Sequence, residues 1–106
     1  MNFARFILAT AVAAAATTTT ARAQSPADLL QTYGCGGCHA ADAKLVGPSF
    51  HDIAAKYRGD KGAEAKLAAK VKAGGSGAWG AIPMPPNPQV KDDDLKKIVT
   101  FILASK

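Results

Sequence analysis

Two cysteines and a histidine stand close enough in this chain to serve one chemical task. Residues 35–39 read Cys-Gly-Gly-Cys-His, and C-x-x-C-H is the attachment pattern of c-type haem. Thiols at this spacing can each form a thioether with a vinyl group on one porphyrin edge, while the next residue offers an imidazole nitrogen to the iron. The intervening glycines let the backbone turn tightly. We therefore expect Cys35 and Cys38 to bind haem c covalently and His39 to be an axial ligand of its iron.

Three other chemistries could use the same side chains. A disulfide between Cys35 and Cys38 is allowed in an oxidising compartment, but it leaves His39 without a task. A thioredoxin-like redox pair needs a βαβ context, and no strand pattern is visible. A zinc site would combine both cysteines with His39 or His51. Four-ligand zinc sites usually draw on two separated pairs, and the second pair is missing here.

Met84 is the candidate for the second axial position of the iron. It stands in the run Ile-Pro-Met-Pro-Pro-Asn-Pro at 82–88 and is the only methionine besides Met1. A lone methionine usually fills a core, but the flanking prolines fix the backbone and indicate a stiff loop. His51 is the rival ligand. His39/Met84 ligation would raise the reduction potential and fill both axial positions, which favours electron transfer over catalysis.

The first 23 residues differ from the rest of the chain. Arg5 precedes an uncharged, largely apolar run at 6–16, and the segment ends in Ala-Arg-Ala at 21–23. This pattern predicts a secretory signal peptide over residues 1–23, cleaved before a domain at 24–106. The alternative is a membrane anchor, but the apolar run is about half of the roughly 20 residues that a bilayer needs. We expect a periplasmic protein without stable membrane insertion.

The elements that position these side chains are expected to be helices joined by long loops. Ser25 followed by proline and then Asp28 predicts a helix start. Helical spacing also appears at 50–57 and 63–73, with glycines ending the second of these segments. Residues 78–91 are rich in proline and are expected to be loop. No segment alternates well enough to predict a strand, so the fold class is all-α with three or four helices.

The last helix has the clearest pattern. Three aspartates at 92–94 stand where a helix N-terminus favours negative charge, and we expect them to cap it. The apolar stripe that follows keeps helical spacing. It comprises Leu95, Ile98, Val99 and Ile102, widened by Phe101 and Leu103.

Size and charge narrow the classes of function. Residues 24–106 hold too few side chains for a thick core, and short domains often need a metal, disulfide or cofactor. They carry 11 Lys and Arg against 8 Asp and Glu. This modest positive charge suits an acidic protein partner. The sequence has no Arg-rich patch with interleaved aromatics, so nucleic acid is not an expected partner.

Taken together, these motifs resemble the small bacterial class I cytochromes c of the cytochrome c-551 type. The similarity covers nearly all of residues 24–106. Besides the segment at 35–39, the matching segments are 46–48 (Val-Gly-Pro), 52–54 (Asp-Ile-Ala), 62–65 (Gly-Ala-Glu-Ala), 79–80 (Trp-Gly) and 82–87 (Ile-Pro-Met-Pro-Pro-Asn).

The resemblance implies a cytochrome c fold around one covalently bound haem, with His39 and Met84 as axial ligands. It implies that the Pro48 carbonyl accepts the ring N–H of His39, which would fix the ring. Trp79 and Lys70 match positions that reach a haem propionate. Three further implications concern the Met84 sulfur, the helix crossing and the haem edge. Asn87 lies near the sulfur, and Gly34 and Phe101 pair where the first and last helices cross, where a glycine lets the helices approach closely. The residues that rim an exposed haem edge are Val46, Ile82, Pro83, Pro85 and Pro86.

The resemblance also implies a function. It indicates a monomeric one-electron carrier, not an enzyme, with redox partners such as a periplasmic nitrite reductase or a terminal oxidase. Two alternatives stay open from the residues alone. A haem peroxidase or gas-binding protein would leave Met84 off the iron, and a thiol-redox module would carry no haem.

Overall fold

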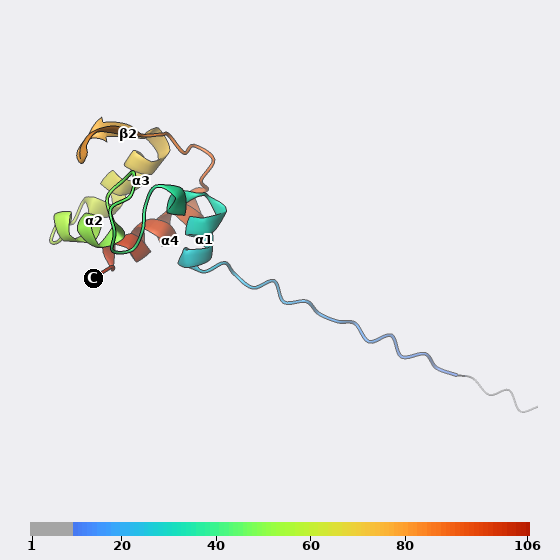
Figure 1. Cartoon of the computed structure of the whole chain (residues 1–106). Helices are drawn as coiled ribbons and strands as arrows, with labels where there is room; N and C mark the ends of the chain where they lie inside the picture. Colours follow the sequence, from blue (N-terminus) through green and yellow to red (C-terminus); the bar gives the residue numbers. More distant parts are fainter. Residues whose placement is uncertain (1–9) are drawn as a thin grey trace, which may run out of the picture.

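The structure, a computed structural model, describes residues 10–106. Residues 10–25 form neither helix nor strand, and in Figure 1 they run away from a folded body. Arg5 and the start of the apolar run lie outside the described residues. The elements in chain order are α1 (Pro26–Thr32), the 3₁₀ helix η1 (Cys35–Gly37), α2 (Phe50–Lys56), α3 (Ala63–Ala73), β1 (Gly75–Gly77), β2 (Gly80–Met84) and α4 (Asp92–Leu103).

The helix starts follow from side chains that satisfy the first backbone N–H groups. Ser25 accepts from the Asp28 N–H at 3.2 Å, and Asp28 accepts from the Ser25 N–H in return, a capping box. Ser49 accepts from the Asp52 N–H at 3.1 Å and so begins α2. The predicted helix start at Ser25 is confirmed, and the helices predicted at 50–57 and 63–73 are confirmed to within one residue.

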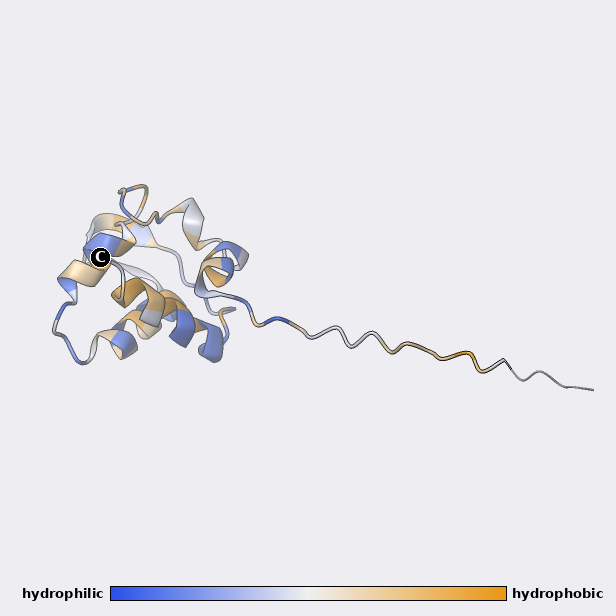
Figure 2. Cartoon of the chain, turned by 90° about the horizontal axis from the view of Figure 1, so that it is seen from below, coloured by the Kyte–Doolittle hydropathy of each residue, from blue (hydrophilic) through white to orange (hydrophobic). Residues whose placement is uncertain are grey.

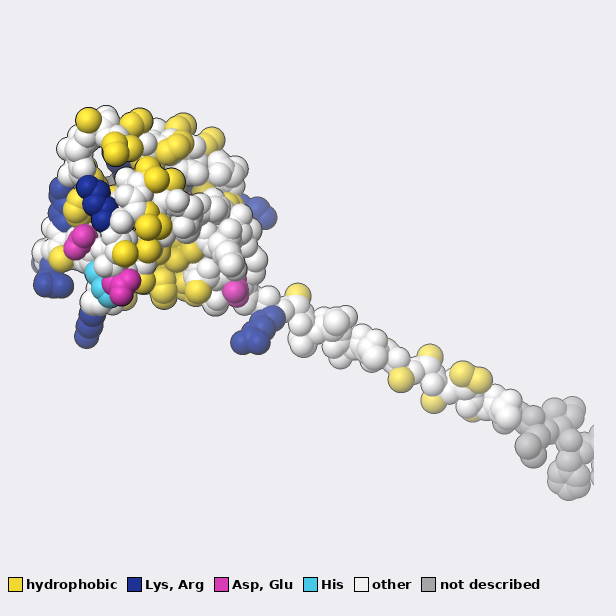
Figure 3. Space-filling view, viewed as in Figure 1, with side chains coloured by type: hydrophobic (Ala, Val, Ile, Leu, Met, Phe, Trp, Pro, Cys, Tyr) yellow, Lys and Arg dark blue, Asp and Glu magenta, His cyan; other side chains and the backbone are white. Residues whose placement is uncertain are grey.

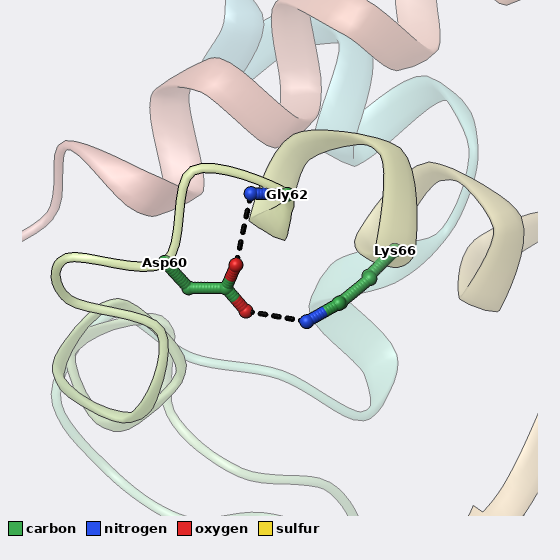
Figure 4. A network of polar contacts seen from close by, with 3 residues as sticks. All are labelled: Asp60, Gly62 and Lys66. Carbon is green, nitrogen blue, oxygen red and sulfur yellow. Dashed lines mark hydrogen bonds and ion pairs between the residues drawn. The ribbon is translucent and has the colours of Figure 1, made fainter.

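The start of α3 depends on a charged network (Figure 4). One carboxylate oxygen of Asp60 accepts from the Gly62 N–H at 2.8 Å, and the other pairs with the Lys66 ammonium at 2.7 Å. These contacts supply an acceptor and a negative charge at a helix N-terminus, where both are favourable.

Helix α4 supplies the largest share of the core. The predicted stripe of Leu95, Ile98, Val99 and Ile102 is buried against α1, α2 and α3. The prediction that Phe101 widens this stripe is wrong, because 40% of its surface is exposed. Val90, just before the helix, is buried instead and joins the same cluster. Figure 2 shows orange, hydrophobic ribbon gathered inside the folded body, while the tail also carries orange stretches.

The aspartates at 92–94 occupy the first turn of α4 as predicted, but none caps it. The N-cap residue is Lys91, and no side chain there makes a capping hydrogen bond. Asp92 pairs instead with Lys72 of α3 at 2.9 Å, and Asp94 accepts from the Tyr33 hydroxyl of α1 at 2.6 Å. The acidic run therefore ties α4 to two neighbouring helices.

The expectation of no strands, and of loop throughout 78–91, is wrong. β1 and β2 form an antiparallel hairpin that pairs Gly75 with Met84 and Gly77 with Gly80, with an irregularity between the pairs. Both strands are exposed almost throughout. Because neither strand has a buried face, the sequence shows no alternation of hydrophobic and polar residues there. Pro83 also lacks the N–H that a central strand needs, so nothing in this segment predicted a strand.

Gly34 is required for a different reason from the one that the resemblance implied. A Cβ on Gly34 would meet no atom within 4 Å, so close approach of α1 and α4 does not demand glycine there. Its φ of +75° does demand glycine, because residues with a side chain rarely adopt a positive φ. No helix within residues 10–106 is long and apolar enough to cross a bilayer.

Candidate haem site

A cavity of about 440 Å³ opens between the hairpin, the helices and the loop that joins η1 to α2. Its walls include Cys35, Cys38, His39 and Met84. A protein that binds haem through these residues should have a cavity between Cys38, His39 and Met84, and this prediction is confirmed. The remaining wall is mainly apolar and comes from all four α-helices and both strands. Figure 3 shows hydrophobic side chains spread over the middle of one face.

The imidazole of His39 is held from three directions. Its Nδ1 lies 2.7 Å from the Pro48 carbonyl oxygen, which can only accept, so Nδ1 carries the proton. Phe50 stacks on the ring at a centroid distance of 5.7 Å. A Cβ on Gly47 would lie 2.6 Å from the ring carbon Cε1, so the bare backbone of Gly47 packs against the imidazole. With Nδ1 protonated, the Nε2 lone pair is available to a metal.

The two cysteines are free and half-buried at the edge of the cavity. Burial raises the pKa of the Cys35 thiol above its ordinary value, which disfavours the thiolate that thiol-redox chemistry needs. No group of three His, Cys, Asp or Glu side chains that could hold a metal ion occurs among the described residues. The disulfide, thioredoxin-like and zinc readings of Cys35 and Cys38 therefore find no support.

Met84 ends β2 and is half-buried in the cavity wall. The loop after it is fastened to α3, because the Asn87 N–H donates to the Val71 carbonyl at 2.9 Å. The side-chain amide of Asn87 donates to the Pro85 carbonyl at 2.9 Å, and Asn87 is not among the residues of the wall. His51, the rival ligand, is not among them either.

Trp79 and Lys70 both belong to the wall. Trp79, in the turn of the hairpin, is 42% exposed. The Lys56 ammonium of α2 lies 4.5 Å from the centroid of its ring and donates to the Ala78 carbonyl at 2.6 Å. Lys56 thus joins α2 to the hairpin turn through a cation–π contact and a hydrogen bond. Sequence reasoning missed it, since one lysine on a polar helix face carries no signal.

The residues of this cavity fit a haem. Two thiols, an imidazole with a free nitrogen and a thioether converge on one apolar space. These are the attachment and ligand types of c-type cytochromes. The apolar wall matches the hydrophobic shell that controls solvent access and dielectric around a metal.

Comparison with known proteins identifies the family. The family model described as cytochrome c matches residues 23–106. The chain belongs to the cytochrome c family. This cytochrome is 55% identical over 75 residues to cytochrome c-551 of Allochromatium vinosum, with 71% of this chain and 80% of the relative covered. It is 48% identical over 84 residues to cytochrome c-551 of Pseudomonas aeruginosa, covering 79% and 80%.

Solved structures give the same result. The crystal structure of Nitrosomonas europaea cytochrome c552 superposes on this cytochrome with a TM-score of 0.72 at 49% identity, covering 76% of this chain and 99% of that one. The predicted cytochrome c fold and the resemblance to the c-551 type are therefore confirmed, with the hairpin as an addition. Like its relatives, this cytochrome is an electron-transfer protein with one covalently bound haem c and its iron.

Proposed function

We propose that this cytochrome is a periplasmic one-electron carrier whose iron is held by His39 and Met84. Cys35 and Cys38 form the two thioethers to the haem. The bound group supplies an iron that cycles between two oxidation states. The observation that carries the proposal is the convergence of two thiols, the oriented imidazole and the only thioether of residues 10–106 on one cavity.

The neighbouring residues take supporting roles in this proposal. Pro48 keeps the His39 ring oriented through the 2.7 Å hydrogen bond to Nδ1. Trp79 and Lys70 donate to the haem propionates from the cavity wall. Asn87 belongs to the haem environment through the Met84 loop, since its amide holds the Pro85 carbonyl. These residues keep the haem and its ligands in place, and the Met/His ligation itself raises the reduction potential.

The proposal includes export and redox partners. Residues 1–23 act as a signal peptide and residues 24–106 form the mature monomer, which does not insert stably in the membrane. The residues expected to rim the haem edge include Val46 and Ile82, which are 52% and 65% exposed. Lysines at the cavity, among them Lys44 and Lys70, suit an acidic partner. A periplasmic nitrite reductase or a terminal oxidase is the proposed class.

Intact mass and absorption spectroscopy test this proposal on protein made with the cytochrome maturation machinery. The expected mass is that of residues 24–106 plus one haem, in the periplasmic fraction. An unmodified mass would instead support a thiol-redox module. The oxidised protein should show the weak long-wavelength band of sulfur bound to iron. Its absence, together with ready carbon monoxide binding by the reduced form, would support an enzyme or gas sensor.

Replacing the proposed sulfur ligand is the sharper test. Met84→Ala should abolish the sulfur-to-iron band, lower the reduction potential and open the iron to added ligands, because Met ligation raises the potential. His51→Ala serves as the control and should keep the band, because His51 does not line the cavity. An unchanged potential in Met84→Ala, or loss of the band in His51→Ala, would reject Met84 as the ligand.

A further inference from the structure

The Met84 loop crosses the end of α3 at Gly74, and the two backbones touch there. A Cβ on Gly74 would collide with the Met84 carbonyl oxygen, and would lie 2.7 Å from the Pro86 nitrogen and 2.8 Å from the Pro85 carbonyl carbon. Real Cβ atoms essentially never come closer than 3.0 Å to such neighbours. All three obstacles are backbone atoms, so no change of rotamer could make room.

The conformation of Gly74 points the same way. Its φ of +66° and ψ of −159° lie in a region that residues with a side chain rarely enter. The helix end holds it there, since its N–H donates to the Lys70 carbonyl at 2.7 Å. Gly74 is therefore both the C-cap of α3 and the residue against which the backbone of the Met84 loop packs.

The loop is fastened to the chain around Gly74 on both sides of the contact. Before it, Met84 pairs with Gly75 across the hairpin. After it, the Asn87 N–H donates to the Val71 carbonyl at 2.9 Å. Between these two points, prolines at 85 and 86 restrict the backbone. The separation between Gly74 and the loop therefore sets where residue 84 stands relative to the cavity.

Neighbouring glycines do not share this role. A Cβ on Gly75 would meet only the flexible end of the Lys70 side chain, at 3.0 Å. A Cβ on Gly77 or Gly80 would meet no atom within 4 Å. The close contact with the Met84 loop belongs to Gly74 alone among the glycines of the described chain.

We propose that Gly74 is a positioning residue for the Met84 ligand. Its missing side chain lets the 84–86 backbone lie directly on the end of α3, and this contact sets how closely the thioether approaches the iron. The inference rests on the proposed function of Met84 and adds a residue outside the ligand set. Gly74 acts through the loop and does not itself touch the cofactor.

Gly74→Ala tests the proposal against a matched control. Gly59→Ala places a Cβ at a φ of +78° with no atom within 4 Å, so it brings the strain of a positive φ without the collision. Both variants should lose stability, but only Gly74→Ala should lose most of the sulfur-to-iron band and show a lower potential. Because the collision pushes the Met84 loop away and weakens the competing sulfur ligand, we expect the oxidised Gly74→Ala variant to bind added imidazole about tenfold more tightly than wild type.

The outcomes separate this inference from the proposed function. A wild-type protein without the band rejects Met84 as ligand and this proposal with it. The second outcome concerns Gly74 alone. If the wild type shows the band but Gly74→Ala and Gly59→Ala have equal bands, potentials and imidazole affinities, the proposed role of Gly74 is overturned and that of Met84 stands.

A further pair of variants keeps the test decisive if Gly74→Ala does not fold. Pro86→Gly frees the loop to retreat, so Gly74→Ala/Pro86→Gly should fold with the band lost. A band as strong in the double variant as in Pro86→Gly would equally overturn the proposal.

Discussion

The ring of His39, the proposed iron ligand, is held in one orientation by its neighbours. The Pro48 carbonyl oxygen accepts a hydrogen bond from Nδ1, 2.7 Å away, Phe50 stacks on one face, and the backbone of Gly47 packs against the ring edge. The hydrogen bond selects the tautomer with a free Nε2, and the two packing contacts limit rotation of the ring. The orientation and the tautomer of the imidazole are thus both set by neighbours close in sequence.

Gly47→Ala should disturb this arrangement without straining the backbone. The new Cβ would lie 2.6 Å from Cε1 and 3.0 Å from Nδ1 of His39, so either the ring or the loop must move. We expect a loss of about 1–3 kcal/mol in the free energy of unfolding, as for overpacking, and a changed reduction potential. Denaturant titration and potentiometry of the holoprotein measure the two effects.

Gly62→Ala is the matched control for that variant. A Cβ at residue 62 would meet its nearest atoms at 3.4 and 3.6 Å, which is ordinary contact. It should leave the potential unchanged. Equal potentials in the two variants would show that Gly47 does not constrain the imidazole.

The sequence could pick out the residues proposed to bind the haem, all of which line the cavity, but not all of the residues that orient them. Cys35, Cys38 and His39 were found because the attachment chemistry demands those types at that spacing. Gly47 was marked only as part of a family match, because its role depends on a distance to the His39 ring that no sequence pattern encodes. Lys56 was missed for the same reason.

At the scale of elements, the helices were predictable and the hairpin was not. α1 and α4 carry explicit signals, namely the capping box at Ser25 and the buried stripe beginning at Leu95. The hairpin depends on glycines with positive φ at 75, 77 and 80 and has no buried face to create alternation. Glycine and proline residues predict that a helix ends, but they do not indicate that β1 and β2 pair as a hairpin.

The start of α3 makes a prediction about acid stability. Hydrogen bonding from Lys66, helped by the Gly62 N–H, holds the pKa of the Asp60 carboxyl below its ordinary value. A carboxyl with a lower pKa in the folded state stabilises the protein above its unfolded pKa of about 4. That stabilisation fades as the pH falls through the lower, folded pKa.

Asp60→Asn should therefore lower the thermal midpoint at pH 7 by only a few degrees, because the pair is exposed. The difference from wild type should shrink as the pH falls below about 4. Thermal unfolding of both proteins at several pH values measures it, with Asp42→Asn as the control for loss of one exposed carboxylate. A difference that stays constant from pH 7 to pH 3 would contradict the assigned network.

At the scale of the whole molecule, the cavity is continuous with the hydrophobic core. Side chains that are otherwise buried among the helices, including Leu30, Val90, Ile98 and Val99, also line the cavity. If it were closed and dry, an apolar space of about 440 Å³ would cost on the order of 10 kcal/mol at about 24 cal/mol per Å³. Domains are stable by about 5–15 kcal/mol in total. The chain without its cofactor must therefore collapse around the space, flood it or unfold.

Cys35→Ala/Cys38→Ala, produced without haem, tests this dependence directly. We expect little cooperative unfolding by circular dichroism and fast hydrogen exchange in α4, because its buried face at Ile98 and Val99 loses the group that it packs against. The control is Cys35→Ala matured with haem, which keeps one thioether and should fold with reduced stability. A haem-free double variant with a sharp thermal transition and protected amides in α4 would show that the polypeptide completes its own core. The cavity would then be a binding site in an already stable fold, and the cofactor would tune function without being required for structure.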